Sequence, residues 1–557
     1  MILPDYCGYG QLFAFSGIDG ENSHDDDFAG MLMNDRISVR FDFDDPVTLS
    51  VPTDEKIGVV LSDAIKGEDT LIVFVSKDTV AGVSPHRSRI FSERFPQSDD
   101  DGDISFISTD GCVFCLYRER DGFVFLRAGN NDDAVAKAKA IIGMDIEALF
   151  EERINYFKEK PLCKDPGFEK LYYKCLSVNK VNVYSPQGGI DCRSTTPDRL
   201  PHRHVWLWDS MFHAMAISSY DTRLAKESIL AVLQCQRDDG FIPHMMESRD
   251  RISGITQPQV IAWAALSVYR IDKDRDFLAR CAGKIDRFLR WFIDNRDKNR
   301  NGLFEWHTDY ANTRCRCDES GMDNSPRFDT LETLDAIDSS CFMANDCHAL
   351  SVIYDELGEK EKSIYFFNLY RETGNLINRL LWDEETGIYC DRDFGGNLTH
   401  VMTVSGFLPM FAGVCPDSRT EKLRALLTDP EKFATAFPVP SISRDNPLYG
   451  GDMWRGCTWL NYNFMIILGL RKYGHYDLAE EIRLKTLRCV DRIFEKTGNI
   501  FEFYDAKDKT EPWKLNRKGP QPGIPDYRKK YHSITDYNWT ASFLILMIQN
   551  DFDRFEI

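Results

Sequence analysis

Two carboxylates stand in turn-rich surroundings at distant points of the chain. Asp323 follows Gly321 by two positions and precedes Pro326 by three. Glu502 lies in the aromatic segment Phe501–Asp505. Gly321 permits a close backbone approach and Pro326 prevents a helix from continuing, so Asp323 is expected on irregular backbone. Glycoside hydrolysis needs such a pair, because one carboxyl group protonates the departing oxygen while the other activates water.

Each carboxylate also has a simpler interpretation. In this interpretation Asp323 caps a helix or stabilises its own loop through hydrogen bonds. Glu502 forms a salt bridge with a cation at a hairpin edge. Alternation along the extended segment places Glu502 and Tyr504 on one side of it. Apolar neighbours would favour the protonated form of Asp323, as a general acid requires. The sequence therefore predicts Asp323 and Glu502 as catalytic residues.

Aromatic clusters at the starts of predicted helices are candidates for sugar binding. Trp206-Leu207-Trp208-Asp209 opens one helix, where Asp209 either caps the helix or binds sugar hydroxyls beside a tryptophan. Trp454 and Arg455 stand together at the start of another. Sugar rings bind to aromatic faces paired with planar polar donors, although a single tryptophan is more often part of a core. The predicted substrate-binding residues are Trp206, Trp208, Asp209, Gln257, Trp306, Glu319, Trp454, Arg455 and Tyr504.

A run of oxygen-bearing side chains precedes the loop that holds the first carboxylate. Asp297, Asn299, Asn301 and Glu305 are spaced like the first half of a calcium loop. The bidentate glutamate that such a loop carries at its last position is replaced by Thr308. The alternative is a turn in which Asp and Asn side chains cap the backbone. A structural calcium at these four residues and a capped turn both stay open, and no cofactor is expected for catalysis.

The overall composition restricts the class of partner. The chain has 557 residues, a net charge of -20 and 43% hydrophobic residues. Phosphate binding needs clustered Lys and Arg, so neither nucleic acid nor an anionic membrane is expected as a partner. The first residues lack the basic and apolar regions of a signal peptide, and no apolar run is long enough to span a bilayer. The 16 cysteines are scattered, which favours reduced thiols and a cytoplasmic location.

The first part of the chain contains predicted strands. Segments 36–43, 70–75, 103–108 and 122–126 carry β-branched and aromatic residues and are bounded by Gly, Asp or Asn. Strands at this spacing without intervening helices predict an antiparallel β-sandwich over residues 1–130. All ten tryptophans fall after this part of the chain, and that asymmetry marks a domain boundary.

The remainder of the chain is predicted to be helical. Residues 131–164, rich in Ala, Glu and Lys, are expected to form a linker helix. Over residues 165–557 the apolar period becomes that of a helix. Twelve helices in pairs, without strands between them, predict a mainly α fold with an (α/α)6 barrel whose loops converge on a central pocket. The predicted helices cover residues 166–179, 208–219, 221–237, 257–270, 275–295, 339–357, 359–381, 401–413, 419–429, 456–473, 475–496 and 537–549.

Several of these motifs follow one another in the order typical of a known family. The chain resembles glycoside hydrolase family 63, a relative of the family 37 trehalases, across roughly residues 200–545. The resemblance implies an inverting, exo-acting α-glycosidase on an (α/α)6 barrel, with Asp323 as general acid and Glu502 as general base. The usual Trp-Arg-Gly-Pro motif ends in Cys457 here. The matching motifs are Trp206–Phe212, Gln257-Pro258, Glu319–Arg327, Trp454-Arg455-Gly456 and Phe501–Tyr504.

Three classes of function follow from these observations. The leading hypothesis is inverting hydrolysis of a terminal α-glycosidic bond, foremost of an α-glucoside in an oligosaccharide or small glycoside. Mannosylglycerate, glucosylglycerate and trehalose are alternative substrates. A second class is sugar epimerisation or polysaccharide lysis on the same barrel, which would use paired bases. A third is a glycan-binding protein without catalysis. The histidines available to the second class are His204, His213, His244, His307 and His348.

Overall fold

The structure is a computed structural model that describes most of the chain. The described residues are 14–16, 36–41, 47–52, 59–61, 63–92, 94–100, 102–198, 202, 204–330, 334–519 and 532–557. Residues 1–13, on which the expectation of no signal peptide rests, lie outside this set. Residues 42 and 43 of the first predicted strand lie outside it as well.

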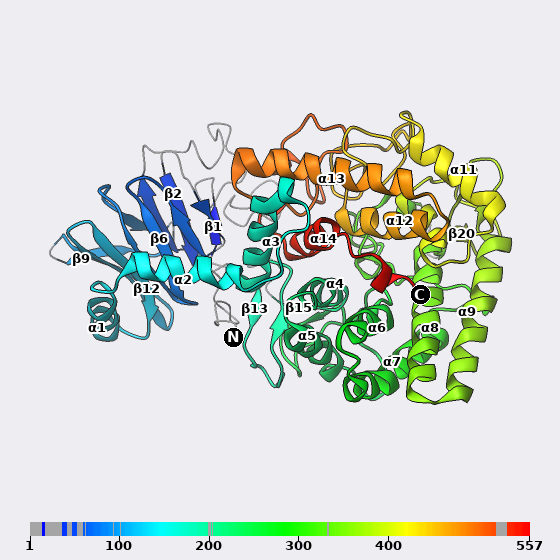
Figure 1. Cartoon of the computed structure of the whole chain (residues 1–557), viewed down its shortest axis with the longest axis horizontal. Helices are drawn as coiled ribbons and strands as arrows, with labels where there is room; N and C mark the ends of the chain where they lie inside the picture. Colours follow the sequence, from blue (N-terminus) through cyan, green and yellow to red (C-terminus); the bar gives the residue numbers. More distant parts are fainter. Residues whose placement is uncertain are drawn as a thin grey trace.

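The strands of the N-terminal region form two antiparallel sheets at one end of the molecule (Figure 1). The smaller sheet has the order β1-β2-β3-β8 and the larger the order β4-β5-β6-β7-β12-β11-β10-β9. The bounds are β1 Ala14–Ser16, β2 Arg36–Phe41, β3 Val47–Pro52, β4 Val59–Val60, β5 Ala64–Lys66, β6 Leu71–Ser76, β7 Thr79–Val83, β8 Arg89–Phe91, β9 Gln97–Asp100, β10 Ile104–Thr109, β11 Cys112–Glu119 and β12 Gly122–Ala128.

The two sheets face one another across a shared apolar core. Val39 of the smaller sheet and Phe74 of the larger belong to the same buried cluster. The other face of the larger sheet is covered by α1 (Asn131–Ile141) and α2 (Ile146–Lys158). The segment expected as one linker helix therefore holds two helices, and both of them pack on the sheet.

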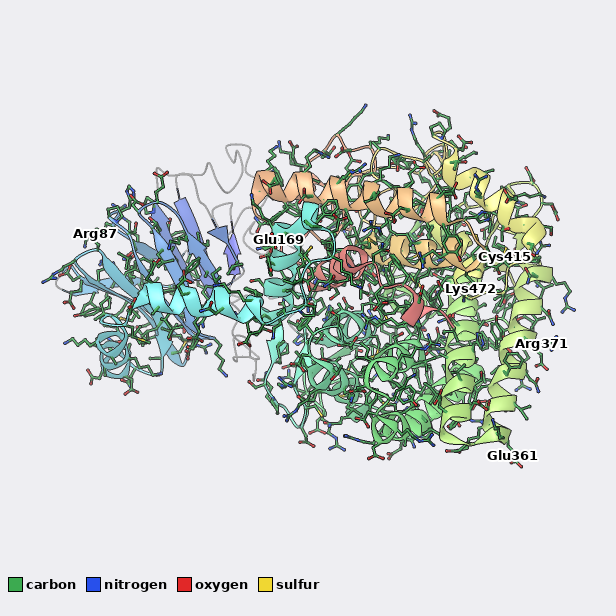
Figure 2. The ribbon with its side chains drawn as sticks, viewed as in Figure 1. Arg87, Glu169, Glu361, Arg371, Cys415 and Lys472 are labelled. Carbon is green, nitrogen blue, oxygen red and sulfur yellow. The ribbon has the colours of Figure 1, made fainter. Side chains whose placement is uncertain are left out.

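Six of the following helices form a closed ring within the described part of the chain. α14, α4, α6, α8, α10 and α12 contact one another in that order, and α12 returns to α14. α3, α5, α7, α9 and α13 pack against this ring, and α11 lies at the periphery in Figure 1. Side chains fill the space between the helices (Figure 2). The bounds are α3 Glu169–Val181, α4 Leu207–Ile217, α5 Thr222–Gln234, α6 Ile261–Asp272, α7 Arg275–Asn295, α8 Ile337–Leu357, α9 Lys360–Leu380, α10 Leu408–Phe411, α11 Asp417–Thr428, α12 Leu460–Lys472, α13 Tyr476–Thr497 and α14 Asn538–Gln549.

Each of the twelve predicted helices is present, and most boundaries agree within a few residues. The largest difference concerns residues 401–413. A 3-10 turn, Val404–Phe407, leads there into the short α10, and Gly413 with a φ of 71° follows its end. None of the helices in the described residues pairs the length with the hydropathy that a bilayer-spanning segment needs.

The N-terminal ends of three inner helices meet at one end of the ring. Trp208 and Trp539 lie in the first turns of α4 and α14, with ring centroids 5.3 Å apart. Trp459, directly before α12, lies 5.4 Å from Trp539. The loops that precede these helices therefore converge at this end, where the predicted site residues also lie.

Candidate active site

Asp323 lies on an irregular segment that packs against a tryptophan. The segment follows the short 3-10 helix Asp318–Ser320 and turns at Gly321, whose φ is 70°. A Cβ atom at Gly321 would overlap the indole ring of Trp208, so only glycine fits this position. The turn lets the chain pass over the start of α4 and brings Asp323 to the end of the ring.

A buried arginine fixes the chain on the other side of Asp323. Arg327 is fully enclosed and donates to both Asp338 and Asp391, with Nε 2.7 Å from Asp391 Oδ2. The same guanidinium lies 3.4 Å from the sulfur of Met322. Burial would lower the pKa of Arg327, but the two carboxylates raise it well above its ordinary value. Breaking such a buried pair is costly, so the loop has little freedom.

The carboxyl group of Asp323 faces a cavity and an ammonium group. Its Oδ2 atom lies 2.7 Å from Nζ of Lys518, and the side chain is 16% exposed. Burial would lower the pKa of Lys518, but Asp323, Cys315 and Asp318 raise it above its ordinary value. The adjoining cavity measures about 320 Å³. An ammonium group thus replaces the apolar neighbours that the sequence predicts, and Asp323 is accessible to a ligand.

Glu502 is enclosed and lies on an extended segment. Its backbone N–H donates to the carbonyl of Ile534 at 2.8 Å, and the residue is 2% exposed. Nε of Arg517 lies 3.0 Å from Oε2 of Glu502. Burial would lower the pKa of Arg517, but Glu502 raises it above its ordinary value. The guanidinium supplies the positive charge that a buried carboxylate needs.

Two consecutive cations connect the two carboxylates. Arg517 contacts Glu502, and the next residue, Lys518, contacts Asp323. Successive Cα atoms are about 3.8 Å apart, so the two carboxylates are reached from one short stretch of backbone. The charge of Asp323 also contributes to the raised pKa of Arg517. Two residues that stand far apart in the sequence therefore meet at one site.

Asp452 fixes the position of this stretch of backbone. Its carboxylate accepts from the backbone N–H groups of Lys518 at 2.9 Å and of Gly519 at 2.8 Å. It also accepts from Nδ2 of Asn324 at 3.0 Å. Lys518 has a φ of 61°, a left-handed conformation that non-glycine residues rarely adopt. The contacts of Asp452 join the segment after Arg517 to the loop of Asp323.

Asp209 is a third carboxyl group at this site. It is buried in the first turn of α4, and its Oδ1 atom has no hydrogen-bond partner among the described residues. Burial, followed by the charges of Glu502, Asp198 and Asp323, raises its pKa well above the ordinary value. Burial and then Asp209 raise the pKa of the Tyr537 hydroxyl. Asp209 therefore offers one carboxyl oxygen without a partner in the described residues, and its raised pKa favours the protonated form.

The predicted residues around the start of α4 have different placements. Trp206 is partly exposed, its Nε1 donates to the carbonyl of His202 at 3.2 Å, and its ring meets that of His244 edge-on at 5.1 Å. Oε1 of Gln257 accepts from the backbone N–H of Trp208 at 3.3 Å. Trp206 thus keeps an accessible aromatic surface, while Gln257 and Trp208 shape the turn beneath Gly321.

Trp454 and Arg455 are adjacent in the sequence but differ in their environment. Trp454 is buried and stacks on Trp459, with ring centroids 3.9 Å apart and planes within 2°. Arg455 lines the cavity beside Asp323, and its Nη2 lies 2.5 Å from Oδ1 of Asp329. Arg455 is therefore placed to meet a ligand, whereas Trp454 belongs to the aromatic layer beneath the site.

Three predicted substrate-binding residues are enclosed by protein. Glu319 accepts from Arg296 at 2.5 and 2.8 Å and from two backbone N–H groups. Nε1 of Trp306 donates to Asp338 at 2.8 Å, and the hydroxyl of Tyr504 accepts from a backbone N–H at 2.8 Å. All three are buried. In this structure these contacts are with protein, and a contact with substrate stays a prediction.

The predicted calcium loop carries oxygen atoms that suit calcium. Nδ2 atoms of Asn299 and Asn301 donate to the two oxygens of Asp335 at 2.9 and 2.7 Å. Asp297 accepts from the backbone N–H of Asn301 at 2.9 Å. Burial raises the pKa of Glu305, whose Oε2 atom has no partner among the described residues. The donor set fits a hard cation as well as a capped turn, and calcium stays a prediction.

The buried histidines offer little to a proton-abstraction mechanism. Burial lowers the pKa of His213 to about 3, and its Nδ1 pairs with Thr195 Oγ1 at 2.9 Å. Burial also lowers the pKa of His244 to about 4 and that of His348 to about 4. The ring of His348 stacks on Tyr370 at 4.4 Å. His213 is enclosed, His244 and His348 are partly buried, and all three rings are held by contacts with protein.

Several residues of the site carry no clear sequence signal. Asp198, Arg517, Lys518 and Tyr537 lie on irregular backbone before or between helices. Asp452 follows two glycines, which predicts a turn but not a contact with Asn324. The adjacent pair of cations was the one feature that could have been noticed, since both carboxylates need a partner when they are buried.

The site and the ring together define a class of enzyme. A carboxyl group at a cavity and a second, enclosed carboxyl group reached from the same short stretch of backbone are compatible with the apparatus of a glycoside hydrolase. The family model of the mannosylglycerate hydrolase MGH1-like glycoside hydrolase domain matches residues 202–540. The match covers more than half of the chain, so the chain belongs to this family and is a glycoside hydrolase. The resemblance to glycoside hydrolase family 63 is confirmed.

Relatives with assigned names include hydrolases of small and large glycosides. The mannosylglycerate hydrolase of Thermus thermophilus is 26% identical over 398 residues, which are 56% of this chain and 91% of that protein. The mannosylglycerate hydrolase MGH1 of Selaginella moellendorffii is 25% identical, over 61% of this chain and 82% of that protein. The alpha-glucosidase 2 of Arabidopsis thaliana is 23% identical, over 64% of this chain and 53% of that protein.

Solved structures share the fold. The GH63 mannosylglycerate hydrolase from Thermus thermophilus in complex with Tris and D-glycerate has a TM-score of 0.54 and 22% identity, and it covers 67% of this chain and 99% of that one. Neutral trehalase Nth1 from Saccharomyces cerevisiae has a TM-score of 0.50 and 15% identity, and it covers 68% of this chain and 79% of that one. At these identities the likeness concerns the fold alone.

Proposed function

We propose that the chain is an inverting, exo-acting glycoside hydrolase that cleaves a terminal α-glycosidic bond. In this proposal the ring of helices and its outer layer form an (α/α)6 barrel, and the two facing sheets form a β-sandwich before it. Asp323 is the general acid and Glu502 the general base. The observation that carries the proposal is the pair of carboxylates on either side of Arg517-Lys518.

The positions of the two carboxylates relative to the cavity support these roles. Asp323 faces the cavity, where the departing group must leave and where its oxygen needs a proton. Glu502 is enclosed and is held by Arg517, so it can draw a proton only from a molecule inside the site. Inversion requires a water molecule between the base and the sugar, which corresponds to carboxyl groups roughly 6.5–9.5 Å apart.

The terminal sugar would be recognised between the two carboxylates. Asp209 carries an unpaired carboxyl oxygen, and the raised pKa of Asp209 makes it a hydrogen-bond donor toward a sugar hydroxyl. Trp206 offers an aromatic surface at the same end of the ring. Enclosure of this kind on one side of the bond, with an open cavity on the other, suits removal of a terminal residue.

Within this reaction class we favour an acidic leaving group. The cavity beside Asp323 is lined by Arg314, Arg316, Arg455 and Lys518. Two of the arginines share a single carboxylate, Asp329, as their partner. Asp323, Asp329 and Asp452 also line the cavity, so its lining carries one positive charge in excess, which attracts a carboxylate on the leaving group. The names of several relatives agree with this preference, so mannosylglycerate and glucosylglycerate come before α-glucosides and trehalose as substrates.

Product analysis by proton NMR tests the reaction and the substrate together. The purified chain is incubated with mannosylglycerate, glucosylglycerate, maltose, kojibiose, nigerose and trehalose. We expect the β-anomer of the released sugar to appear first, and Asp323→Asn to abolish its release. An initial α-anomer would exclude inversion, an unsaturated sugar would indicate lysis, and binding without turnover on every substrate would favour a glycan-binding protein.

A further inference from the structure

A histidine lies on the far side of the arginine that holds Glu502. Nε2 of His202 lies 2.8 Å from Nη2 of Arg517, and Nδ1 of His202 lies 2.5 Å from Oδ2 of Asp198. The same guanidinium reaches Glu502 through Nε at 3.0 Å. Asp198, His202, Arg517 and Glu502 therefore form one continuous line of contacts, and His202 lies more than three hundred residues from Arg517 in the sequence.

The chemistry of arginine determines which ring nitrogen carries the proton. A guanidinium has only donors, so Nε2 of His202 must accept the hydrogen bond and carries no proton. The proton of the neutral ring then sits on Nδ1 and is donated to the carboxylate of Asp198. Asp198 is buried, so this acceptor is present whenever the chain is folded. The contacts specify one tautomer of one ring.

The backbone and the ring of His202 are both held in place. The carbonyl of His202 accepts from Oγ1 of Thr196 at 2.7 Å and from Nε1 of Trp206 at 3.2 Å. Its ring meets the rings of Trp206 and Tyr537 edge-on at 5.5 and 5.8 Å. A ring that is fixed by two hydrogen bonds and two aromatic edges presents its acceptor at a constant position.

We propose that His202, oriented by Asp198, is a positioning residue that keeps Arg517 against Glu502. The proposal rests on the assignment of Glu502 as the general base. Arg517 has donors on several sides. When its Nη2 donates to His202, its Nε stays directed at the carboxylate of Glu502. The contact between His202 and Arg517 then fixes the position of Glu502, although His202 takes no part in the reaction. A carboxylate that orients a catalytic imidazole through a hydrogen bond acts in the same way.

Protonation of the ring would remove this support. A charged imidazole has two donors and no acceptor, so Nε2 would repel the guanidinium of Arg517. The charged and titratable groups that contact the ring are Asp198, Arg517 and Tyr537, and Glu502 lies beyond Arg517. The support of Arg517 therefore depends on the acceptor at Nε2 and not on the bulk of the ring.

Two substitutions at His202 separate positioning from simple packing. His202→Gln keeps an acceptor oxygen near the place of Nε2, whereas His202→Leu fills similar space without one. We expect His202→Leu to lower kcat about 10- to 100-fold with a change in KM below about threefold, and to move the acid limb of kcat/KM to higher pH. His202→Gln should retain at least about a third of kcat and the acid limb of the native chain. Equal losses in both variants would overturn the proposal.

Asp198→Asn provides a second variant should His202→Leu fold poorly. The amide can donate to Nδ1 of His202, which would move the ring proton to Nε2 and turn it toward Arg517. We expect the same shift of the acid limb as in His202→Leu, with melting curves close to those of the native chain. An unchanged pH profile in a folded Asp198→Asn protein would overturn the proposal.

A double-mutant cycle with Arg517→Met completes the test. His202→Leu should have little further effect once Arg517 is replaced, because both changes remove the same contact. Additive losses would overturn the proposal. Glu502→Gln is measured in parallel: if it keeps its activity, the assignment of the base is wrong. If Glu502→Gln is inactive and His202→Leu behaves like the native chain, only the positioning role is wrong.

Discussion

The two sides of the active site differ in how far the protein encloses its carboxylate. Asp323 is 16% exposed beside a cavity, and its partner is the flexible side chain of Lys518. Glu502 is 2% exposed, and its partner Arg517 is held by a further buried network. In the proposed mechanism the acid meets leaving groups that differ between substrates, whereas the base meets only water and one sugar. The difference in enclosure follows this division of tasks.

The same stretch of backbone serves both sides, so the difference lies in the side chains. Arg517 has a planar fork that can bind Glu502 and His202 at once, and it is pre-organised for that role. Lys518 is a point charge on a flexible stem, so it can move when a ligand enters the cavity. A rigid base side and an adaptable acid side are therefore built from consecutive residues.

The largest effects are expected when each carboxylate is replaced in turn. Asp323→Asn and Glu502→Gln should each lower kcat by about 10³-fold on natural glycosides, because each removes a proton transfer. Their responses to the leaving group should differ. A glycosyl fluoride needs no protonation to depart, so Asp323→Asn should recover much of its activity on this substrate and Glu502→Gln should not. Initial rates on the fluoride and on a disaccharide measure this contrast.

The result can contradict the assignment in two ways. Recovery of Glu502→Gln in place of Asp323→Asn would exchange the roles of acid and base. Asp329→Asn is a suitable control, since Asp329 lies at the same cavity and pairs with Arg455. A loss in Asp329→Asn as large as in Asp323→Asn would show that the cavity tolerates no change of charge, and the comparison would then carry no information about proton transfer.

Replacement of Arg517 and of Lys518 tests whether the side of Glu502 is rigid and the side of Asp323 adaptable. Arg517→Met removes a charged hydrogen bond to Glu502, which is typically worth about 1.5–3 kcal/mol, so we expect a loss of about 10- to 100-fold in kcat. Lys518→Met should cost less than about tenfold on neutral glycosides.

The activities of Lys518→Met and Arg517→Met on different substrates provide a further test. Lys518→Met should lose more activity on mannosylglycerate than on maltose, because an acidic leaving group would contact Lys518 in the cavity. Arg517→Met should lose the same factor on both substrates. Equal losses of Lys518→Met on mannosylglycerate and maltose would contradict an acidic leaving group. They would not affect the assignment of Asp323 and Glu502.

The sequence predicts the helical ring well and the contacts of the site poorly. The period of apolar residues is a local signal, and it predicts the twelve helices α3 to α14 of the described residues, six of which form the ring. Asp323 and Glu502 were recognised because Gly321 and the aromatic segment mark unusual backbone near each of them. Arg517 and His202 are linked across more than three hundred residues of sequence, and no local pattern encodes that contact.

Side-chain direction is the second limit of the sequence. Glu319 stands only four residues before Asp323, yet it turns inward to Arg296, while Asp323 turns toward the cavity. Alternation along the extended segment predicts Tyr504 on the same side as Glu502. The hydroxyl of Tyr504 instead accepts from a backbone N–H, and its ring lies 5.0 Å from that of Phe437. On irregular backbone the period of two does not hold, and tertiary packing decides which side chain faces the ligand.

Gly321→Ala, beside Asp323, should lower the free energy of unfolding more than Gly358→Ala does elsewhere in the chain. Gly321→Ala introduces a Cβ atom into the ring of Trp208 at a φ of 70°, so we expect a loss of about 2–4 kcal/mol in the free energy of unfolding together with reduced kcat. Gly358→Ala is the control, because Gly358 has a φ of 83° and open space around it. Denaturant unfolding should show about 1 kcal/mol there. Equal losses would remove the contact with Trp208 from the argument.

The last effect concerns stability and not turnover, and it comes from Asp209, whose carboxyl group interacts with the charges of both Asp323 and Glu502. Burial and the charges of Glu502, Asp198 and Asp323 raise the pKa of Asp209, so the folded chain binds more protons than the unfolded chain. Its contribution to the free energy of unfolding therefore falls as pH rises above about 3.9, the value in the unfolded state, until the folded-state pKa is reached.

Asp209→Asn removes this titration and should gain stability relative to the native chain as pH rises from 5 to 8. The gain is at most about 1.4 kcal/mol per pH unit, and urea unfolding at four pH values measures it. Asp238→Asn, at an exposed position, should show no such slope. A flat difference for Asp209→Asn would mean that the carboxyl group is ionised in the folded chain. Asp209 would then be an acceptor, and the charges of the acid and base sides would act on it less than their positions indicate.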